Sequence, residues 1–160
     1  MNALAQSLLS QAARGRMLSD RDLSEFSASE FREAIAALVA DNKVALADAL
    51  CEAGLALHPG DPHVLSMAAL MASLHEDWTR AEDYLRELIA AQGDVHVTEF
   101  TWNQLTRVLR CQCEPFEALS VAKTGLIYHP HSADLQREVS ELKDLLGDVS
   151  AFVGPIQQRQ

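Results

Sequence analysis

The chain has 160 residues and a formal net charge of −10, with 23 acidic side chains against 13 lysines and arginines. This balance argues against binding to nucleic acid or to an anionic membrane surface, because both need clustered cations. No run of 18 apolar residues occurs, so the sequence predicts no transmembrane helix. The length fits one domain with its own core, and 48% of the residues are hydrophobic, mainly alanine and leucine, which favours helices.

The first 27 residues form a segment that precedes the main domain. Leu4, Leu8 and Leu9 lie on one face of a helix predicted over residues 2–14. A helix this short is marginal in water by itself. We therefore expect the three leucines to pack on the rest of the chain or to pair with a second copy in a homodimer.

Residues 28–147 contain three copies of a helix–turn–helix unit. In each copy a small residue of the second helix is followed twelve positions later by a helix breaker. The three pairs are Ala47 with Pro59, Ala81 with Gly93, and Ala118 with Pro130. The alanines are 34 and then 37 residues apart, which fits one period plus an insertion of three residues near position 96. A small side chain is needed where two helices cross closely, because a larger one would push them apart.

Start and stop signals set the predicted helix limits. Ser27 and Glu30 form a capping-box pattern, and Asp61 followed by Pro62 is typical of a helix start. The predicted helices are 28–40, 44–57, 62–75, 79–91, 98–112, 115–128 and 133–146. Gly147 is expected to end the last helix, and residues 148–160 are expected to form a loose tail. The last helix would cover the third unit, with Arg137, Glu138, Glu141, Lys143 and Asp144 on its polar outer side.

The pattern of these units resembles the tetratricopeptide repeat, which has a period of 34 residues. In the first unit the resemblance is carried by Phe31-x-x-Ala34-Ile35-x-x-Leu38 with Ala47-x-x-x-Cys51, and in the second unit by Leu65, Ala68, Ala69 and Ala72. In the third unit it is carried by Trp102-x-x-Leu105-Thr106-x-x-Leu109 with Ala118-x-x-x-Ala122. The resemblance implies an all-α fold of three helix pairs in a right-handed solenoid, with an N-terminal amphipathic helix and a C-terminal capping helix. The alternative is an ordinary antiparallel helical bundle whose spacings coincide by chance.

No pattern in the sequence predicts catalysis. A nucleophile elbow, a phosphate-binding glycine loop and an HExxH motif are all missing from it. Cys111 and Cys113 are closer together than a usual zinc pair and no second pair follows, so free thiols are expected, with a redox or metal role left open. His129 and His131 flank a proline on a turn and are expected to be solvated. We therefore predict a protein that is not an enzyme and needs no metal or cofactor.

The first helices of stacked repeats line a concave groove, and this groove is the predicted binding site for an extended segment of a partner protein. The groove positions are Ser29, Arg32, Ala36 and Val39 in the first unit, His63, Ser66, Leu70 and Ser73 in the second, and Phe100, Asn103, Arg107 and Arg110 in the third. This set contains three arginines, no acidic residue and short polar side chains that can bind a peptide backbone. As an alternative, Arg107 and Arg110 pair with acidic residues of a neighbouring helix.

An acidic chain of this length with three such units resembles the class II type III secretion chaperones, over residues 1–147. More particular points are Met17-Leu18 with the polar run to Phe26, and Leu50-Cys51 before a turn. The resemblance implies a protein of the bacterial cytoplasm that holds a secreted translocator or needle subunit in its groove, with homodimer contacts through the N-terminal helix. The other hypotheses are a general tetratricopeptide adaptor or scaffold of a bacterial assembly, and a regulatory subunit of an enzyme complex.

Overall fold

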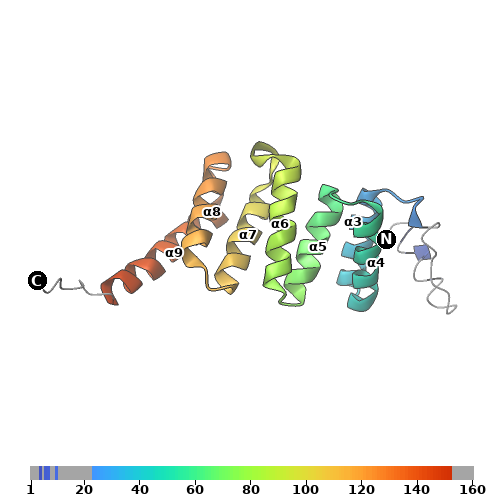
Figure 1. Cartoon of the computed structure of the whole chain (residues 1–160), viewed down its shortest axis with the longest axis horizontal. Helices are drawn as coiled ribbons and strands as arrows, with labels where there is room; N and C mark the ends of the chain where they lie inside the picture. The colour runs from blue at the N-terminus through green and yellow to red at the C-terminus, as the bar shows by residue number, and fades with distance from the viewer. Residues whose placement is uncertain (1–3, 5, 8–9, 11–22, 153–160) are drawn as a thin grey trace, which may run out of the picture. The chain divides into compact units, whose positions relative to one another are not determined.

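The computed structural model describes residues 4, 6, 7, 10 and 23–152, and Figure 1 shows its helices in chain order. These residues form seven α-helices, one short 3-10 helix and no β-strand. The elements are α3 (Ala28–Ala40), α4 (Val44–Leu57), α5 (Pro62–Leu74), α6 (Trp78–Gln92), η1 (Asp94–His96), α7 (Glu99–Cys111), α8 (Pro115–Tyr128) and α9 (Ala133–Phe152). The predicted all-α fold of paired helices is confirmed. None of the helices in the described residues is long and apolar enough to cross a lipid bilayer.

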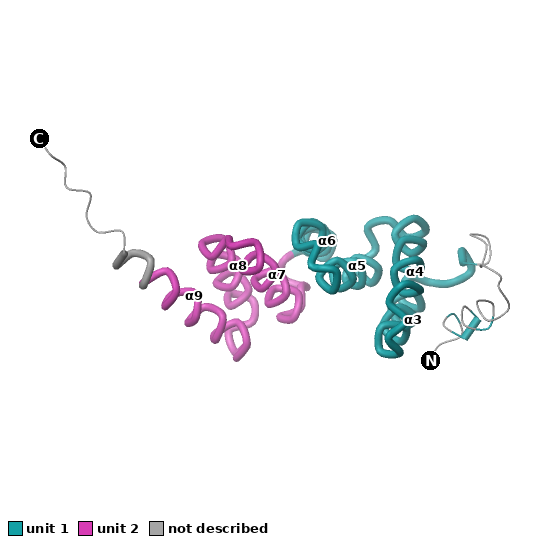
Figure 2. The backbone as a smooth tube through the Cα atoms, turned by 90° about the horizontal axis from the view of Figure 1, so that it is seen from below, with its two compact units in different colours: residues 1–93 teal, residues 94–160 magenta. Residues whose placement is uncertain are grey.

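The chain divides into two compact units, residues 1–93 and residues 94–160 (Figure 2). In unit 1, α3 packs against α4, and α5 packs against α3, α4 and α6. These helices therefore form two successive pairs, α3 with α4 and α5 with α6. Ala47 and Ala81, the alanines that mark the repeat, are fully buried in their second helices. Their burial agrees with the close helix crossing predicted from the sequence.

The core of unit 1 lies between these helices. Phe31 and Ile35 of α3 are fully buried there, together with Val64 of α5. Leu4 is also fully buried in this core. Leu4 of the N-terminal segment therefore packs in the core of unit 1.

Unit 2 contains the third pair and the last helix. The 3-10 helix η1 occupies the place of the predicted insertion near position 96. α7 packs against α8, and α9 packs against both. Ala118 of α8 is fully buried, as predicted. The rings of Trp102 and Tyr128 stack between α7 and the end of α8, with centroids 6.1 Å apart and planes 9° from parallel.

The turn inside each helix pair has the same conformation. A residue other than glycine adopts a positive φ in every one: Asn42 at 60°, Glu76 at 58° and Cys113 at 62°. The next amide then reaches back five residues to a helical carbonyl, which closes the first helix of the pair. These bonds run from Lys43 to Leu38, from Asp77 to Ala72 and from Glu114 to Leu109. The same turn therefore joins the two helices of all three pairs.

The positive φ of Cys113 gives a stability prediction. An L-residue in the left-handed region costs roughly 1–2 kcal/mol that glycine does not, and glycine loses part of this gain through its more flexible unfolded chain. Cys113→Gly is therefore expected to stabilise unit 2 by about 0.5–1 kcal/mol. Urea unfolding followed by circular dichroism measures the change, with Cys111→Ala as the control that removes an exposed thiol from helical backbone. Lower stability of Cys113→Gly would mean that the thiol makes a contact worth more than the strain.

Two histidines tie the ends of their helix pairs together. Nε2 of His58 lies 3.0 Å from the carbonyl oxygen of Phe26, and Nε2 of His129 lies 2.7 Å from the carbonyl oxygen of Val97. Each histidine directly follows the second helix of its pair, and each carbonyl lies just before the first helix. The expectation that His129 is solvated is therefore wrong, since its ring is half-buried and bonded, whereas His131 is exposed.

The last helix differs from its prediction in two ways. α9 continues through Gly147 to Phe152, so Gly147 does not end it. Glu138, expected on the outer side, is only 4% exposed. Ser132 caps this helix, with its Oγ 3.4 Å from the amide nitrogen of Leu135. Residues 153–160 lie outside the described residues, and the division of the chain into residues 1–27, 28–147 and 148–160 stays a prediction.

Candidate peptide-binding surface

Four of the predicted groove residues lie in unit 1. Arg32 is exposed on α3, and His63 is exposed at the start of α5, where Asp61 caps the helix. The hydroxyl of Ser66 donates a hydrogen bond to the carbonyl of His63 at 2.8 Å, and Leu70 is half-buried against the core. Because α3 and α5 pack together, this part of the surface combines a cation, an imidazole and an apolar side chain.

The other four lie on α7 in unit 2. Phe100, Asn103, Arg107 and Arg110 follow one another at steps of three and four residues, which places them on one face of the helix. Phe100 is 64% exposed, an unusual exposure for an aromatic residue. Oδ1 of Asn103 is enclosed and finds no hydrogen-bond donor within the described part of the chain. An enclosed carbonyl oxygen without a donor costs free energy in the folded chain, and the rest of the Asn103 side chain is only half-buried.

The two arginines of α7 meet a buried carboxylate from α9. Nε of Arg107 lies 3.5 Å from Oε1 of Glu138, and Nη1 of Arg110 donates to Oε2 of the same residue. Nη1 of Arg110 also lies 3.0 Å from Oε2 of Glu141. The hydrogen bond to Glu138 raises the pKa of Arg110 above its usual range. Pairing with acids of a neighbouring helix, stated as an alternative from the sequence, is what the structure contains.

An open cleft of about 560 Å³ lies beside this ion-pair group. Its lining consists of Arg107, Arg110, Cys111, Arg137, Glu138 and Glu141. Arg107 keeps 68% of its side-chain surface exposed, so this side chain stays accessible to a partner. Glu138 is the member of this group that the sequence did not reveal. The signal that could have found it is the repeat period. The two repeat steps of 34 and 37 residues add up to 71, and 71 residues before Glu138 lies the apolar Met67 of α5. Both residues are buried in the structure.

The predicted self-association residues are only partly described. Leu4 is buried in the core of unit 1, while Leu8 and Leu9 lie outside the described residues. Homodimer formation through this segment therefore stays a prediction. So does a single groove that runs through all three repeats.

The cysteines and acidic residues show no metal centre in the described residues. Cys111 and Cys113 are exposed free thiols, and Cys51 is buried. No group of three or more histidine, cysteine, aspartate or glutamate side chains in this part of the chain is placed to hold a metal ion. The surface offers hydrogen-bonding, ionic and apolar contacts instead.

Comparison with known proteins identifies the fold. No protein-family model and no curated protein matches the chain. Among solved structures, the TPR domain of Sgt2 from Aspergillus fumigatus is similar with a TM-score of 0.68 at 15% identity, over 83% of this chain and 87% of that one. A MamA mutant gives 0.65 at 18% identity, over 81% and 73%. The C-terminal TPR-containing domain of a Plasmodium falciparum FK506-binding protein gives 0.64 at 12% identity, over 84% and 97%. The chain therefore has the tetratricopeptide fold.

Proposed function

We propose that this chain is a non-enzymatic protein-binding module that holds an extended segment of a partner along the first helices of its repeats. The observation that carries the proposal is the face of α7. There the exposed Phe100 lies on the same face as the half-buried side-chain amide of Asn103 and the largely exposed Arg107. An apolar anchor, a backbone ligand and a cation in one line are suited to an extended peptide.

The finer proposal is that the module acts as a type III secretion chaperone in the bacterial cytoplasm. Its client would be a translocator or needle subunit held in an extended form before export. Support comes from the acidic net charge of −10 and from the three helix pairs followed by a closing helix. Support also comes from Leu4 of the N-terminal segment, which is buried in the core of unit 1.

The ion pairs of α7 change how this proposal is tested. Replacing both Arg107 and Arg110 by acids would disturb the buried Glu138 as well as any bound peptide. Phe100→Ala removes a side chain that is mostly outside the core, so the fold is expected to be preserved. Phe116 on α8 provides the matched control, because it is 74% exposed in the same unit but lies on the second helix of the pair.

The experiment measures binding of overlapping peptides that tile a type III secretion translocator, a needle subunit and proteins unrelated to secretion. Phe100→Ala is expected to weaken the best peptide roughly ten-fold or more, as loss of an aromatic anchor does, and Phe116→Ala to change it less than two-fold. Equal effects of the two variants would contradict the α7 surface as the binding site. Binding that needs Phe100 but is found only for peptides of unrelated proteins would keep the module and remove the secretion-chaperone assignment.

A further inference from the structure

A second concave site lies in unit 1, away from the predicted groove. It is a cleft of about 260 Å³ between α4, α5 and α6. α5 contributes Ala68, Met71 and Ala72 to this cleft, whereas its predicted groove residues, Ser66 and Leu70, lie on the opposite side of the helix. Its volume falls below the roughly 300–1,000 Å³ of pockets that enclose drug-sized ligands, and it suits a single long side chain better.

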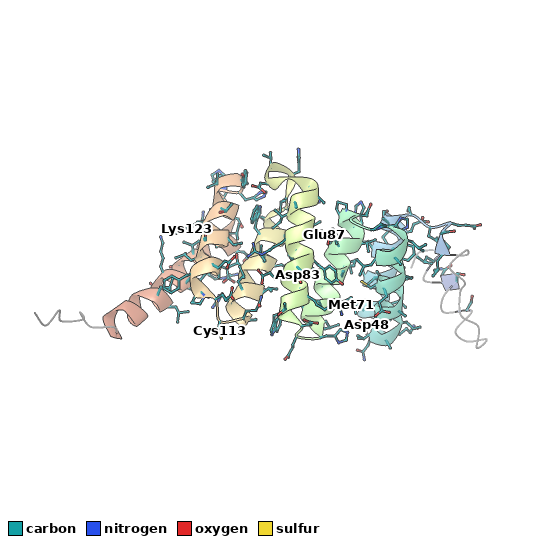
Figure 3. All side chains as sticks on the ribbon, viewed as in Figure 1. Asp48, Met71, Asp83, Glu87, Cys113 and Lys123 are labelled. Atoms are coloured by element: carbon teal, nitrogen blue, oxygen red, sulfur yellow. The ribbon has the colours of Figure 1, made fainter. Side chains whose placement is uncertain are left out.

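The floor of the cleft is apolar. Cys51, Ala68 and Met71 are each less than a tenth exposed, and their carbon and sulfur atoms form its base. A side chain with an aliphatic stem would bury that stem here and gain from the removal of apolar surface from water. Figure 3 shows Met71 on α5 and Asp48 on α4, which line the same cleft.

The rim of the cleft is acidic. Asp48, Glu52 and Asp77 line it, against the one arginine of the lining, Arg80. The excess of two carboxylates over cations gives the rim a negative potential. Burial raises the pKa of the Cys51 thiol to about 11, and the negative charges of Asp48 and Glu52 contribute to this rise.

The chain already places one guanidinium at this rim. Arg80 lies over the ring of Tyr84 with its guanidinium carbon 5.9 Å from the ring centroid, and its Nη2 donates to the Tyr84 hydroxyl at 3.2 Å. His75 occupies the other side, with Nε2 2.8 Å from Oδ1 of Asp48. An aromatic face beside carboxylates is a suitable environment for a cation. Because Arg80 offsets only one of the three carboxylates, the rim retains negative charge for another cation.

We propose that this cleft receives a lysine or arginine side chain presented by a partner protein. The aliphatic stem packs on Met71 and its neighbours, and the cationic head meets Asp48 and Glu52. Contact with both the apolar floor and the acidic rim selects a long basic side chain over a short or a neutral one. The cleft is thus a second contact area, which lies on the side of unit 1 formed by α4 and α6.

The test is a titration of the isotopically labelled full chain with acetyl-arginine N-methylamide, followed by the shifts of backbone amides. Acetyl-citrulline N-methylamide, which has the same length but no charge, is the reference probe. We expect the arginine probe to shift the amides around residues 48–52 and 71–75, and the citrulline probe to bind there roughly three- to ten-fold more weakly. Equal shifts from both probes, or arginine shifts confined to other acidic residues, would overturn the proposal.

Two double variants separate the cleft from the general acidity of the chain. Asp48→Asn with Glu52→Gln removes two charges from the rim, and Asp83→Asn with Glu87→Gln removes two from the exposed side of α6 (Figure 3). The rim pair is expected to weaken the arginine probe roughly three- to ten-fold and the α6 pair less than two-fold at 0.15 M salt. Equal weakening by both pairs would show that only net charge matters and would overturn the site. The single variant Glu52→Gln leaves the Asp48–His75 pair intact and is expected to give part of the weakening of the arginine probe. A folded Glu52→Gln protein that binds the arginine probe as tightly as the unchanged chain would also count against the site.

Discussion

Reversing the charge at both arginines of α7, Arg107→Glu with Arg110→Glu, is expected to lower the free energy of unfolding by about 2–4 kcal/mol. Glu138 is 4% exposed, so its carboxylate depends on these two guanidinium groups for compensation. The double variant would place two further carboxylates beside it. The lower end of this range allows for the exposure of Arg107 and Arg110, whose side chains are 68% and 36% accessible to water.

Urea unfolding of the full chain measures this loss, and a triple variant checks its cause. Adding Glu138→Gln to the double variant removes the repulsion at the buried position and is expected to recover at least 1 kcal/mol. Arg137→Glu is the matched control, because Arg137 is 60% exposed and pairs only with the equally exposed Asp134 among the bonds that the structure records. A loss below about 1 kcal/mol in the double variant would mean that Glu138 is stabilised without the arginines.

Local signals predicted most of the helix limits. The limits of α3, α4 and α8 agree residue by residue, and those of α5, α6 and α7 agree within one residue at each end. Ser27 and Glu30 form the full capping box at the start of α3, with the Ser27 amide 2.9 Å from Oε2 of Glu30. Capping depends on residues three apart in sequence, so a single sequence contains what is needed to predict it.

The predictions for α9 that are wrong concern features that depend on residues far away in the sequence. A glycine after an amphipathic run predicts a helix end at Gly147, but a glycine inside a helix costs only about 1 kcal/mol relative to alanine, and α9 continues through it. The charge of Glu138 predicts a place on the outer side of α9, but the residue is buried. The burial of Glu138 depends on Arg107 and Arg110 of α7, which lie 31 and 28 residues earlier in the sequence and compensate the carboxylate. The positions of Phe100, Asn103 and Arg107 on one face of α7 were predicted, because helical spacing alone determines them.

The equivalence of the first and third helix pairs leads to the second large expected effect. Gly54 of α4 and Gly125 of α8 are 71 residues apart, and each faces the aromatic residue of its first helix. A Cβ added at Gly125 would lie 2.9 Å from Cβ of Trp102 and 2.9 Å from Cδ1 of Leu135. The Cβ of Trp102 is fixed to the backbone of α7, so the helices would have to move apart. At Gly54 the nearest atoms are Cδ1 of Phe31 at 3.1 Å and Cγ1 of Val64 at 3.3 Å, and both lie beyond the Cβ of their side chains.

Gly125→Ala is therefore expected to destabilise the protein by about 1–3 kcal/mol, even after the better helix propensity of alanine is included. Gly54→Ala is expected to change stability by less than about 1 kcal/mol, because the neighbouring side-chain atoms can shift by a few tenths of an ångström. Gly147→Ala is the reference, since a Cβ there would meet nothing within 4 Å, and it should stabilise α9 by about 0.5–1 kcal/mol. Urea unfolding of the three variants measures the series. If Gly125→Ala proved as stable as Gly147→Ala, the close approach of α8 to α7 and α9 at Gly125 would not exist in solution.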